Sequence, residues 1–381
     1  MARWAVIVLV ASCGRIGFES RVTDGGDGGD DTSDAAPIGF SHLVAYGDQT
    51  CAIYRGLAYC WGENASGQLG IPNTVATSIS VPTAVQLPAG RVDDLTEGVN
   101  HGCAIVDGTL YCYGASLGGP PTPVALPSTA TAVGGGNGFT CVVAGSTVYC
   151  WGGSASAGQL AVGDTNPRVA PTQTPLVATT AISIGDDHGC ALEAGAAVCW
   201  GHNDFGALGF GSMNPQTNPV PLAVLGSPTV LPKIAGWHAC DLDAGTVRCW
   251  GEGDHGEVGD GLGVSTATPT IVPGAANATA IGVGGGPADL DASCAVIGGD
   301  VRCWGNGNFG RLGQGVATNS LVPIAVAGLP GPAIAVALGY AHSCALLADG
   351  DLWCWGRGVR GQLGDGLSAN SLVPVRVVPP P

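Results

Sequence analysis

The sequence has little charge and almost no lysine. Charged residues make up 11% of its 381 positions, against about 25% in ordinary globular domains. Lys233 is the single lysine. Because exposed helices depend on Glu, Lys and Arg, this shortage excludes a helical bundle. The 13 basic residues are outnumbered by 29 acidic ones, and the net charge of −16 repels phosphate backbones. Nucleic acid is therefore excluded as an expected partner.

Glycine and proline are abundant instead, with 65 and 26 residues. That composition approaches the range of disordered chains, but 45% of the residues are hydrophobic. The chain therefore has ample apolar material for a core.

Fourteen of the fifteen cysteines form seven pairs, nine residues apart in six cases and ten in the last. Turn-forming residues such as Asp107-Gly108 and Gly298-Gly299 stand midway between the two cysteines of a pair, as in a β-hairpin with a two-residue turn. Cysteines facing each other in such a hairpin have Cα atoms about 4.5 Å apart, which suits a disulfide. The predicted bridges are Cys51-Cys60, Cys103-Cys112, Cys141-Cys150, Cys190-Cys199, Cys240-Cys249, Cys294-Cys303 and Cys344-Cys354.

Metal thiolate sites are the competing interpretation of these cysteines. Such sites usually have two cysteines separated by two to four residues, with a second pair nearby. A separation of nine, centred on a turn and repeated seven times, favours bridged hairpins. Seven disulfides indicate an oxidising compartment.

Cys13 is the one cysteine without a hairpin partner. It follows Arg3, a short apolar run over Trp4–Val10, and Ser12. The run is too short to span a bilayer, which needs about 20 residues. This segment resembles a bacterial lipoprotein signal, which implies that residues 1–13 end at a lipidated Cys13 and that the lipid anchors the protein to a membrane. The prediction is an exported lipoprotein of the cell envelope or outer membrane; a plain secretory signal and a secreted protein are the alternative.

Residues 14–37 are predicted to be a disordered tether, because they are rich in glycine and aspartate and have no apolar periodicity. The run Asp24–Asp34 superficially resembles a calcium-binding loop. It lacks the closing glutamate and the flanking helices of an EF-hand, so the tether is the favoured interpretation.

The remaining sequence, residues 38–378, repeats with a period of 38 to 54 residues between the first cysteines of successive pairs. Each repeat offers about four short strands, and Cys-Trp-Gly and Gly-Gln-Leu-Gly elements recur in order, as in Cys354–Gly356 and Gly361–Gly364. The second repeat lacks Gly-Gln-Leu-Gly. These repeats resemble those of the regulator-of-chromosome-condensation family, which implies an all-β, seven-bladed β-propeller. Leu372–Val378 is expected to supply the strand that completes the first blade.

The tryptophan after the second cysteine is expected to fill the wedge between blades, because neighbouring side chains of a strand face opposite sides. A ligand-stacking cage is the alternative role. The residues at this position are Trp61, Tyr113, Trp151, Trp200, Trp250, Trp304 and Trp355. Histidines stand two residues before the first cysteine in four repeats: His101, His188, His238 and His342. They are interpreted as ties between the strands of a blade, since a shared metal requires ligands about 2.1 Å from the ion.

The sequence has few signs of catalysis. The phosphate-binding Gly-x-x-x-x-Gly-Lys is absent. Asp186-Asp187-His188 and the pair Asp241/Asp243 are weak candidates for a cation site, and solvated turn residues are the favoured interpretation. No cofactor is predicted, and an enzymatic activity is not expected.

The loops after each Cys-Trp-Gly vary while the scaffold repeats, and such loops commonly carry function. We therefore predict a scaffold, expected to be monomeric, that binds another protein through this loop face. A glycan-binding or hydrolytic envelope propeller is the alternative. Nucleotide exchange on a small GTPase, which the family resemblance implies, is less favoured for an exported chain. The candidate partner-binding residues are His202, Asn203, Asp204, Phe205, Asp254, His255, Asn308, Phe309, Arg311, Arg357 and Arg360.

Overall fold

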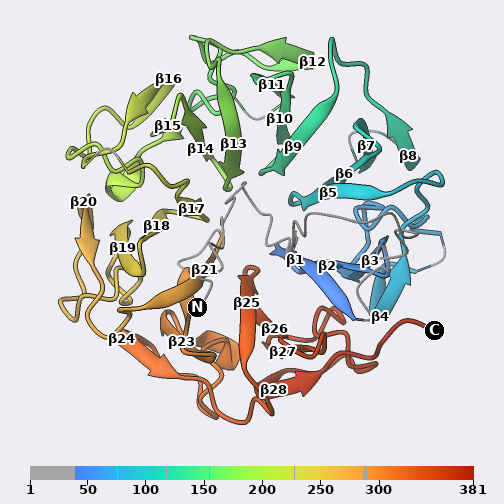
Figure 1. Cartoon of the computed structure of the whole chain (residues 1–381), viewed down its shortest axis with the longest axis vertical. Coiled ribbons are helices and arrows are strands. Elements are labelled where there is room, and N and C mark those ends of the chain that lie inside the picture. Colours follow the sequence, from blue (N-terminus) through green and yellow to red (C-terminus); the bar gives the residue numbers. More distant parts are fainter. Residues whose placement is uncertain (1–38, 75, 116–118, 154, 227, 287–289) are drawn as a thin grey trace, which may run out of the picture.

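The computed structural model describes residues 39–381, except 75, 116–118, 154, 227 and 287–289. Cys13 and the predicted tether therefore lie outside the described residues. Seven four-stranded antiparallel sheets stand around a common centre, each made of four consecutive strands (Figure 1). The predicted all-β, seven-bladed propeller is confirmed.

The blades follow the chain in order. Blade 1 contains β1 (Phe40–Tyr46), β2 (Gln49–Tyr54), β3 (Leu57–Glu63) and β4 (Ser78–Ala84). Blade 2 contains β5 (Val92–Glu97), β6 (His101–Val106), β7 (Thr109–Gly114) and β8 (Gly119–Pro123). Blade 3 contains β9 (Ala130–Gly135), β10 (Phe139–Ala144), β11 (Thr147–Gly152) and β12 (Arg168–Gln173). Blade 4 contains β13 (Thr179–Ile184), β14 (His188–Glu193), β15 (Ala196–His202) and β16 (Thr217–Ala223).

The second half has the same pattern. Blade 5 contains β17 (Lys233–Ile234), β18 (His238–Asp243), β19 (Thr246–Gly251) and β20 (Thr266–Ile271). Blade 6 contains β21 (Ala278–Gly284), β22 (Ala292–Ile297), β23 (Asp300–Gly305) and β24 (Ser320–Ala325). Blade 7 contains β25 (Ala333–Leu338), β26 (His342–Leu347), β27 (Leu352–Gly356) and β28 (Ser371–Arg376). The first strand of each blade lines the centre, and the fourth lies at the rim (Figure 1).

Every cysteine pair sits in the central hairpin of its blade, as the spacing predicts. In blade 1, Tyr54 faces Leu57 and Cys51 faces Cys60. The turn residue Gly56 has φ of +81°, which glycine adopts without steric cost. All seven disulfides form between these facing positions, with Cα–Cα distances of 4.0 to 4.2 Å. The predicted pairing is confirmed in each blade.

The C-terminal strand does not complete the first blade, and that prediction is wrong. β28 pairs with β27 of blade 7, while blade 1 has its own fourth strand, β4, paired with β3. The predicted blade boundaries are shifted by one strand along the chain. Each proline-containing outer strand pairs back onto the hairpin before it rather than forward onto the next hairpin.

Packing and a few backbone bonds join the first and last blades instead. The Phe40 amide donates to the Gly350 carbonyl at 3.0 Å, and the Gly366 amide donates to the Ser80 carbonyl at 2.9 Å. Phe40 and Trp61 pack in one cluster with the Cys344–Cys354 bridge. The ring is therefore closed by the same kind of blade-to-blade contact that holds its other blades together.

The wedge between two blades contains the disulfide of one blade and the aromatic residue of the next. Trp250 of blade 5, for example, packs in one cluster with Cys190 and Cys199 of blade 4. Its indole Nε1 donates to the carbonyl oxygen of Ala207 at 2.9 Å. Ala207 stands in the blade 4 version of the Gly-Gln-Leu-Gly loop. Four other tryptophans bond the corresponding carbonyl of the preceding blade at 2.7 to 3.0 Å: Trp61, Trp200, Trp304 and Trp355. The predicted packing role is confirmed.

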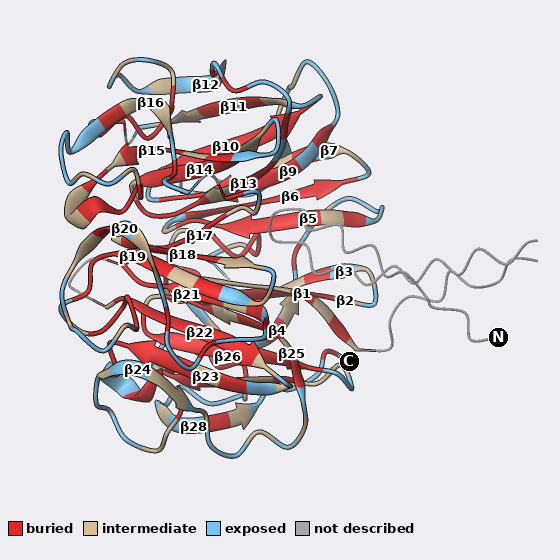
Figure 2. Ribbon diagram, turned by 60° about the vertical axis from the view of Figure 1, so that its left-hand side comes forward, coloured by how far each residue is buried: buried red, intermediate tan, exposed pale blue. Residues whose placement is uncertain are grey.

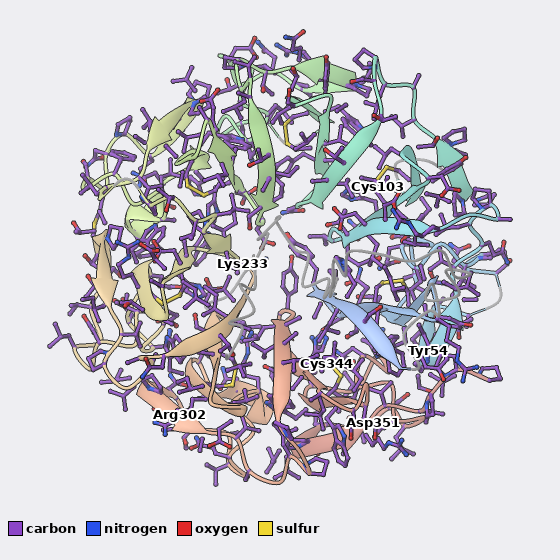
Figure 3. All side chains as sticks on the ribbon, in the orientation of Figure 1. Tyr54, Cys103, Lys233, Arg302, Cys344 and Asp351 are labelled. Atoms are coloured by element: carbon purple, nitrogen blue, oxygen red, sulfur yellow. A yellow bond between two sulfur atoms is a disulfide. The ribbon has the colours of Figure 1, made fainter. Side chains whose placement is uncertain are left out.

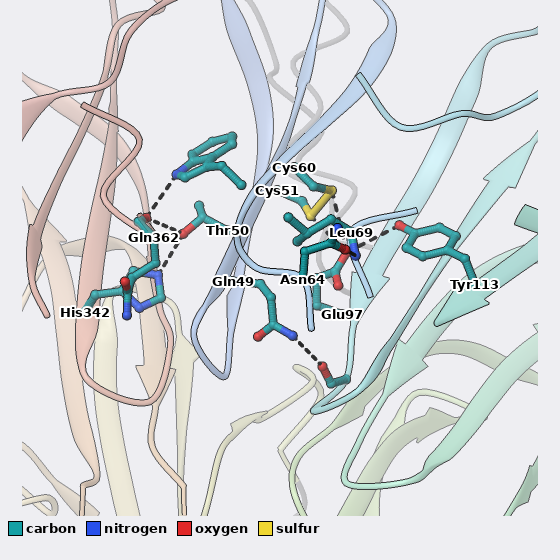
Figure 4. Close-up of a disulfide and its surroundings, with 12 residues drawn as sticks. Gln49, Thr50, Cys51, Cys60, Asn64, Leu69, Glu97, Tyr113, His342 and Gln362 are labelled. Atoms are coloured by element: carbon teal, nitrogen blue, oxygen red, sulfur yellow. Dashed lines mark hydrogen bonds between the residues drawn. A yellow bond between two sulfur atoms is a disulfide. The ribbon is translucent and has the colours of Figure 1, made fainter. Parts of the chain in front are cut away.

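The repeated histidines tie neighbouring blades, not strands of one blade, which corrects the prediction. His342 Nε2 lies 2.7 Å from Thr50 Oγ1 across the ring closure (Figure 4). His101 and His238 contact Thr140 and Ser293 of the next blade at 2.8 and 2.7 Å. The hydrogen bond reaches the next blade because the imidazole lies in the wedge beside the tryptophan.

His188 is the exception, because the next blade has Ala239 where the others have a hydroxyl residue. Its Nε2 is buried without a hydrogen-bond partner, and burial lowers the pKa of His188 to about 3. Ala239→Ser is expected to raise the free energy of unfolding by about 1 kcal/mol, because it supplies the missing partner. Urea denaturation measures the change.

The control for Ala239→Ser is the same substitution in a His188→Phe background, since Phe139 occupies this position in blade 3. The gain should vanish there, because no imidazole remains to accept or donate the bond. An equal gain in both backgrounds would contradict the assignment.

Exposure is concentrated on the rim strands and the connecting loops, while the inner three strands of the blades are largely buried (Figure 2). In the part of the chain that the structure describes, no helix is long and apolar enough to cross a membrane.

Candidate functional site

The connections from first to second strand and from third to fourth strand lie at one end of each blade, because consecutive strands are antiparallel. We call this end the loop face; the other end carries the β-hairpin turns and is the hairpin face. The third-to-fourth connections contain the sequence-predicted binding residues. Two of them include short 3-10 helices, η1 (Asp204–Gly206) and η2 (Asn308–Gly310).

Blades 6 and 7 place an aromatic ring and two arginines together on the loop face. The Phe309 side chain is 39% exposed, beside the exposed Asn308. The guanidinium carbon of Arg357 lies 5.6 Å from the centroid of the Phe309 ring, within cation–π range. Arg360 is 49% exposed in its side chain, and its Nη2 lies 4.0 Å from Glu63 Oε1. We call Asn308, Phe309, Arg357 and Arg360 the blade 6–7 patch.

The orientation of Arg357 is fixed from behind by blade 1. Its Nη1 lies 3.1 Å from Asp48 Oδ2, and Asp48 Oδ1 also accepts a bond of 2.9 Å from the Gln362 amide. The backbone of Phe309 adopts φ of +61°, a left-handed conformation within η2. The patch is therefore held by the scaffold rather than by its own loop alone.

The predicted residues of blades 4 and 5 are held in place by contacts with neighbouring side chains. The ring of Phe205 packs against Trp237 with centroids 5.7 Å apart, so Phe205 is only half exposed. His202 Nε2 lies 3.2 Å from Asp204 Oδ2. His255 Nδ1 lies 3.5 Å from Oε1 of the buried Glu257. These side chains lie on the loop face as predicted.

Asp254 is the exposed residue of the blade 5 loop. Its Oδ1 accepts a hydrogen bond from Ser265 Oγ at 3.3 Å. It therefore remains accessible on the loop face.

Asn203 and Arg311 are fully buried, and the prediction that they contact a partner is corrected. Asn203 Nδ2 donates to the carbonyls of Ser212 and Pro215, which closes its own loop. Arg311 donates to the carbonyls of Leu290, Gly284 and Gly339. Burial lowers the pKa of Arg311 to about 10. Both side chains organise the loop face from inside.

A cluster that the sequence did not reveal lies where the loop face meets the central channel. The hydroxyls of Tyr46 in blade 1 and Tyr340 in blade 7 both donate to Oδ1 of the buried Asp186 in blade 4. The two rings lie 5.9 Å apart. Burial raises the pKa of Asp186 to about 7. This tyrosine–aspartate bridge links blades on opposite sides of the ring.

The cation hypotheses receive no support from this geometry. Asp241 is buried and forms a two-bond ion pair with Arg248 at 2.8 and 2.9 Å. Asp186 accepts from the two tyrosines, and Asp187 Oδ1 accepts from Gln159 at 3.1 Å. Asp186 and Asp241 are therefore not the solvated turn residues that the sequence suggested.

Across the described ranges, the one set of three metal-ligating groups within 4.8 Å of one another is Cys51, Cys60 and Glu97. The two cysteines form a disulfide, so they offer no thiolate. Glu97 Oε1 lies 2.9 Å from Cys51 Sγ and accepts a bond of 3.3 Å from the Tyr113 hydroxyl (Figure 4). Burial raises the pKa of Glu97 well above its ordinary value. Glu97 is therefore a buried acid whose neutral form the fold favours.

Glu97 makes stability depend on pH in a defined direction. The folded state keeps a proton that the unfolded state loses above about pH 4.3, so the free energy of unfolding falls as pH rises. We expect Glu97→Gln to remove this loss. Relative to the wild type, the free energy of unfolding of the variant should increase by up to about 1.4 kcal/mol per pH unit between pH 5 and the pKa of Glu97 in the folded state.

Urea denaturation of both proteins at several pH values measures this difference, and the contribution of Asp186 cancels because both carry it. The control is Asp300→Asn, at an exposed position. A Glu97→Gln difference that stays constant with pH, or one matched by Asp300→Asn, would contradict a neutral Glu97.

Comparison with known sequence families identifies the repeats. The pattern described as "Regulator of chromosome condensation (RCC1) repeat" matches residues 55–105, 298–346 and 349–381, and a second pattern of the same repeat matches 333–362. The chain carries RCC1 repeats.

Curated relatives match this chain over part of their own length. The E3 ubiquitin-protein ligase HERC2 of Mus musculus is 31% identical over 347 residues, covering 85% of this chain and 7% of the ligase. The ultraviolet-B receptor UVR8 of Arabidopsis thaliana is 29% identical over 231 residues, covering 59% of this chain and 41% of the receptor. The chain thus spans less than half of either relative.

Solved structures share the fold. Human WBSCR16 superposes with a TM-score of 0.73 at 21% identity, covering 84% of this chain and 94% of that one. Prp20p of Saccharomyces cerevisiae, in a structure described with its binding properties to Gsp1p and histones, gives a TM-score of 0.72 at 18% identity, with coverages of 90% and 87%. At these identities the likeness extends to the fold.

Aligning the RCC1 repeats shows which features of the candidate site were predictable from the sequence. Arg311 occupies the glutamine position of the Gly-Gln-Leu-Gly loop, whose other members Gln68, Gln159 and Gln362 are all buried. That alignment alone predicts a buried Arg311. Tyr46 and Tyr340 carry no such signal, because their contact with Asp186 joins repeats far apart in the chain.

Proposed function

We propose that this chain is an exported, surface-tethered propeller that binds another protein through the blade 6–7 patch of its loop face. The supporting observation is the exposed Phe309 ring under the guanidinium of Arg357, with Arg360 beside it. Aromatic residues and arginine are the types that dominate protein interfaces. Their orientation is fixed before binding, which lowers the entropy cost of association.

The neighbouring surface favours the same sector. Blades 6 and 7 also expose apolar side chains on their third-to-fourth connections, namely Val316, Val359 and Leu367. An acidic partner surface suits the two arginines of the patch, which lie beside Asp48 and Glu63 of blade 1 but remain partly exposed.

A photo-crosslinking amino acid at position 309 tests this proposal on cells that make the protein. We expect a protein adduct that disappears when Arg357 and Arg360 are both replaced by alanine. The matched control is Arg55→Ala, which removes an exposed arginine from a turn on the hairpin face. An adduct unaffected by the Arg357/Arg360 change, or equally reduced by Arg55→Ala, would refute the patch.

Export and tethering are part of the proposal. Seven disulfides suit an oxidising compartment, and the N-terminal segment ending in Cys13 resembles a lipoprotein signal. Labelling cells with an alkyne-bearing fatty acid tests the anchor. The wild type should be labelled and retained with membranes, whereas Cys13→Ser should be unlabelled. Equal labelling of both would remove Cys13 as the lipid attachment site.

A further inference from the structure

The central channel of the propeller contains the single lysine of the chain. The channel has a volume of about 380 Å³, within the range of small-molecule sites, and the first strands of the blades line it. Lys233 lies on β17, at the inner edge of blade 5 (Figure 3).

Strand register places Lys233 in a ring of otherwise neutral, mostly small residues. Lys233 pairs with the first cysteine of its blade, Cys240. The residues that pair with the first cysteines of the other blades stand at the same level of the channel: Val44, Thr96, Gly134, Ser183, Gly282 and Ala337. The small side chains of this ring leave room in front of the lysine, and Ser183 of the adjacent blade adds a hydroxyl.

The next level of the channel is entirely aliphatic. The residues one position before this ring in the other six blades are Leu43, Leu95, Val133, Ile182, Ile281 and Val336, and all line the channel. The channel therefore offers one ammonium group next to a continuous apolar wall. That combination matches an amphipathic anion rather than a sugar or a nucleotide, which require many polar contacts.

No other charge in the channel competes with Lys233 for an anion. Within the described part of the chain, nothing forms an ion pair or a hydrogen bond with the Lys233 side chain. The His42 imidazole lies 3.5 Å from the Asp94 carboxylate, which also accepts the Val133 amide at 3.1 Å. Burial raises the pKa of Glu97, which favours its neutral form.

The tyrosine–aspartate bridge stands at one end of the channel. Asp186 lies three residues beyond Ser183 along the chain, so the bridge stands at the loop-face end of the channel, past the level of the lysine. A buried acid at that end disfavours a second anionic group there. The opposite end, toward the hairpin face, also carries a buried acid, Asp94, whose carboxylate lies 3.5 Å from the His42 imidazole.

We propose that the central channel binds a straight-chain aliphatic monocarboxylate, with its carboxylate on Lys233 and its alkyl chain against the aliphatic wall. The carboxylate gains a charge-assisted hydrogen bond from the ammonium group. Each methylene that leaves water tightens binding by about fourfold. This site is separate from the blade 6–7 patch, so either proposal can fail without the other.

Isothermal titration with decanoate, below its micelle concentration, tests the site on the folded protein. We expect one decanoate per chain and roughly fifteenfold weaker binding of octanoate, which lacks two methylenes. Decylammonium should not bind, because its charge repels Lys233. Absence of saturable binding, or binding of decylammonium as tight as that of decanoate, would overturn the proposal.

Variants locate the ligand. Lys233→Met should weaken decanoate at least tenfold and leave decan-1-ol unchanged, while Lys233→Arg should bind decanoate like the wild type. Ala337→Leu keeps the lysine but fills the channel at its level, and should weaken both ligands. Equal decanoate affinity in Lys233→Met and wild type, or in Ala337→Leu and wild type, would place the ligand elsewhere. Matching thermal melting curves establish that the variants are folded.

Discussion

Refolding under a thiol reductant is expected to leave this chain without native tertiary structure. Each hairpin disulfide closes a loop of about ten residues and contributes roughly 2–3 kcal/mol in the chain-entropy model. Seven such bridges together exceed the total stability of a typical domain, about 5–15 kcal/mol. Near-ultraviolet circular dichroism of the buried tryptophans measures the recovery of native packing.

The same denatured sample should refold in a glutathione redox buffer, because the cysteines of each pair are close in sequence and meet early. Cys13→Ser serves as the control and should refold like the wild type, since Cys13 has no hairpin partner. Full recovery of the native spectrum in the presence of reductant would contradict the importance of the bridges. The folded protein should resist reductant, because all fourteen bridge sulfurs belong to buried residues.

Replacing Trp250 with alanine is expected to lower the free energy of unfolding by about 3–5 kcal/mol. The substitution leaves a cavity against the Cys190–Cys199 bridge and removes the bond from Nε1 to the Ala207 carbonyl. Trp151→Ala is the matched control, because Trp151 holds the same repeat position but is only half buried. Urea denaturation compares the two. Equal losses would mean that burial in the wedge is not what the tryptophan contributes.

Local features of this fold were predictable from sequence, because each is set within a few residues. A cysteine, a turn dipeptide and a second cysteine specify the hairpin register, and alternation along the strand then sends Cys60 and Trp61 to different neighbouring blades. Repetition of this unit makes the ring. These features depend on no contact between distant repeats.

Features set between repeats were not predictable in the same way. The sequence of an outer strand does not distinguish pairing with the hairpin before it from pairing with the hairpin after it. The prediction therefore places β28 in the wrong blade. The Thr50–His342 bond and the Tyr46–Asp186 bridge join residues hundreds of positions or half the ring apart. Lys233 can be recognised as a candidate site residue only when the strand register places it beside six neutral residues.

Disulfide mapping of the non-reduced protein by mass spectrometry tests the central claim most directly. The account predicts seven linkages, each between the two cysteines of one hairpin, so that the β-hairpin of every blade carries one bridge. Linkages between cysteines of different blades, or fourteen free thiols in protein isolated from its native compartment, would contradict both the stapled propeller and its proposed export.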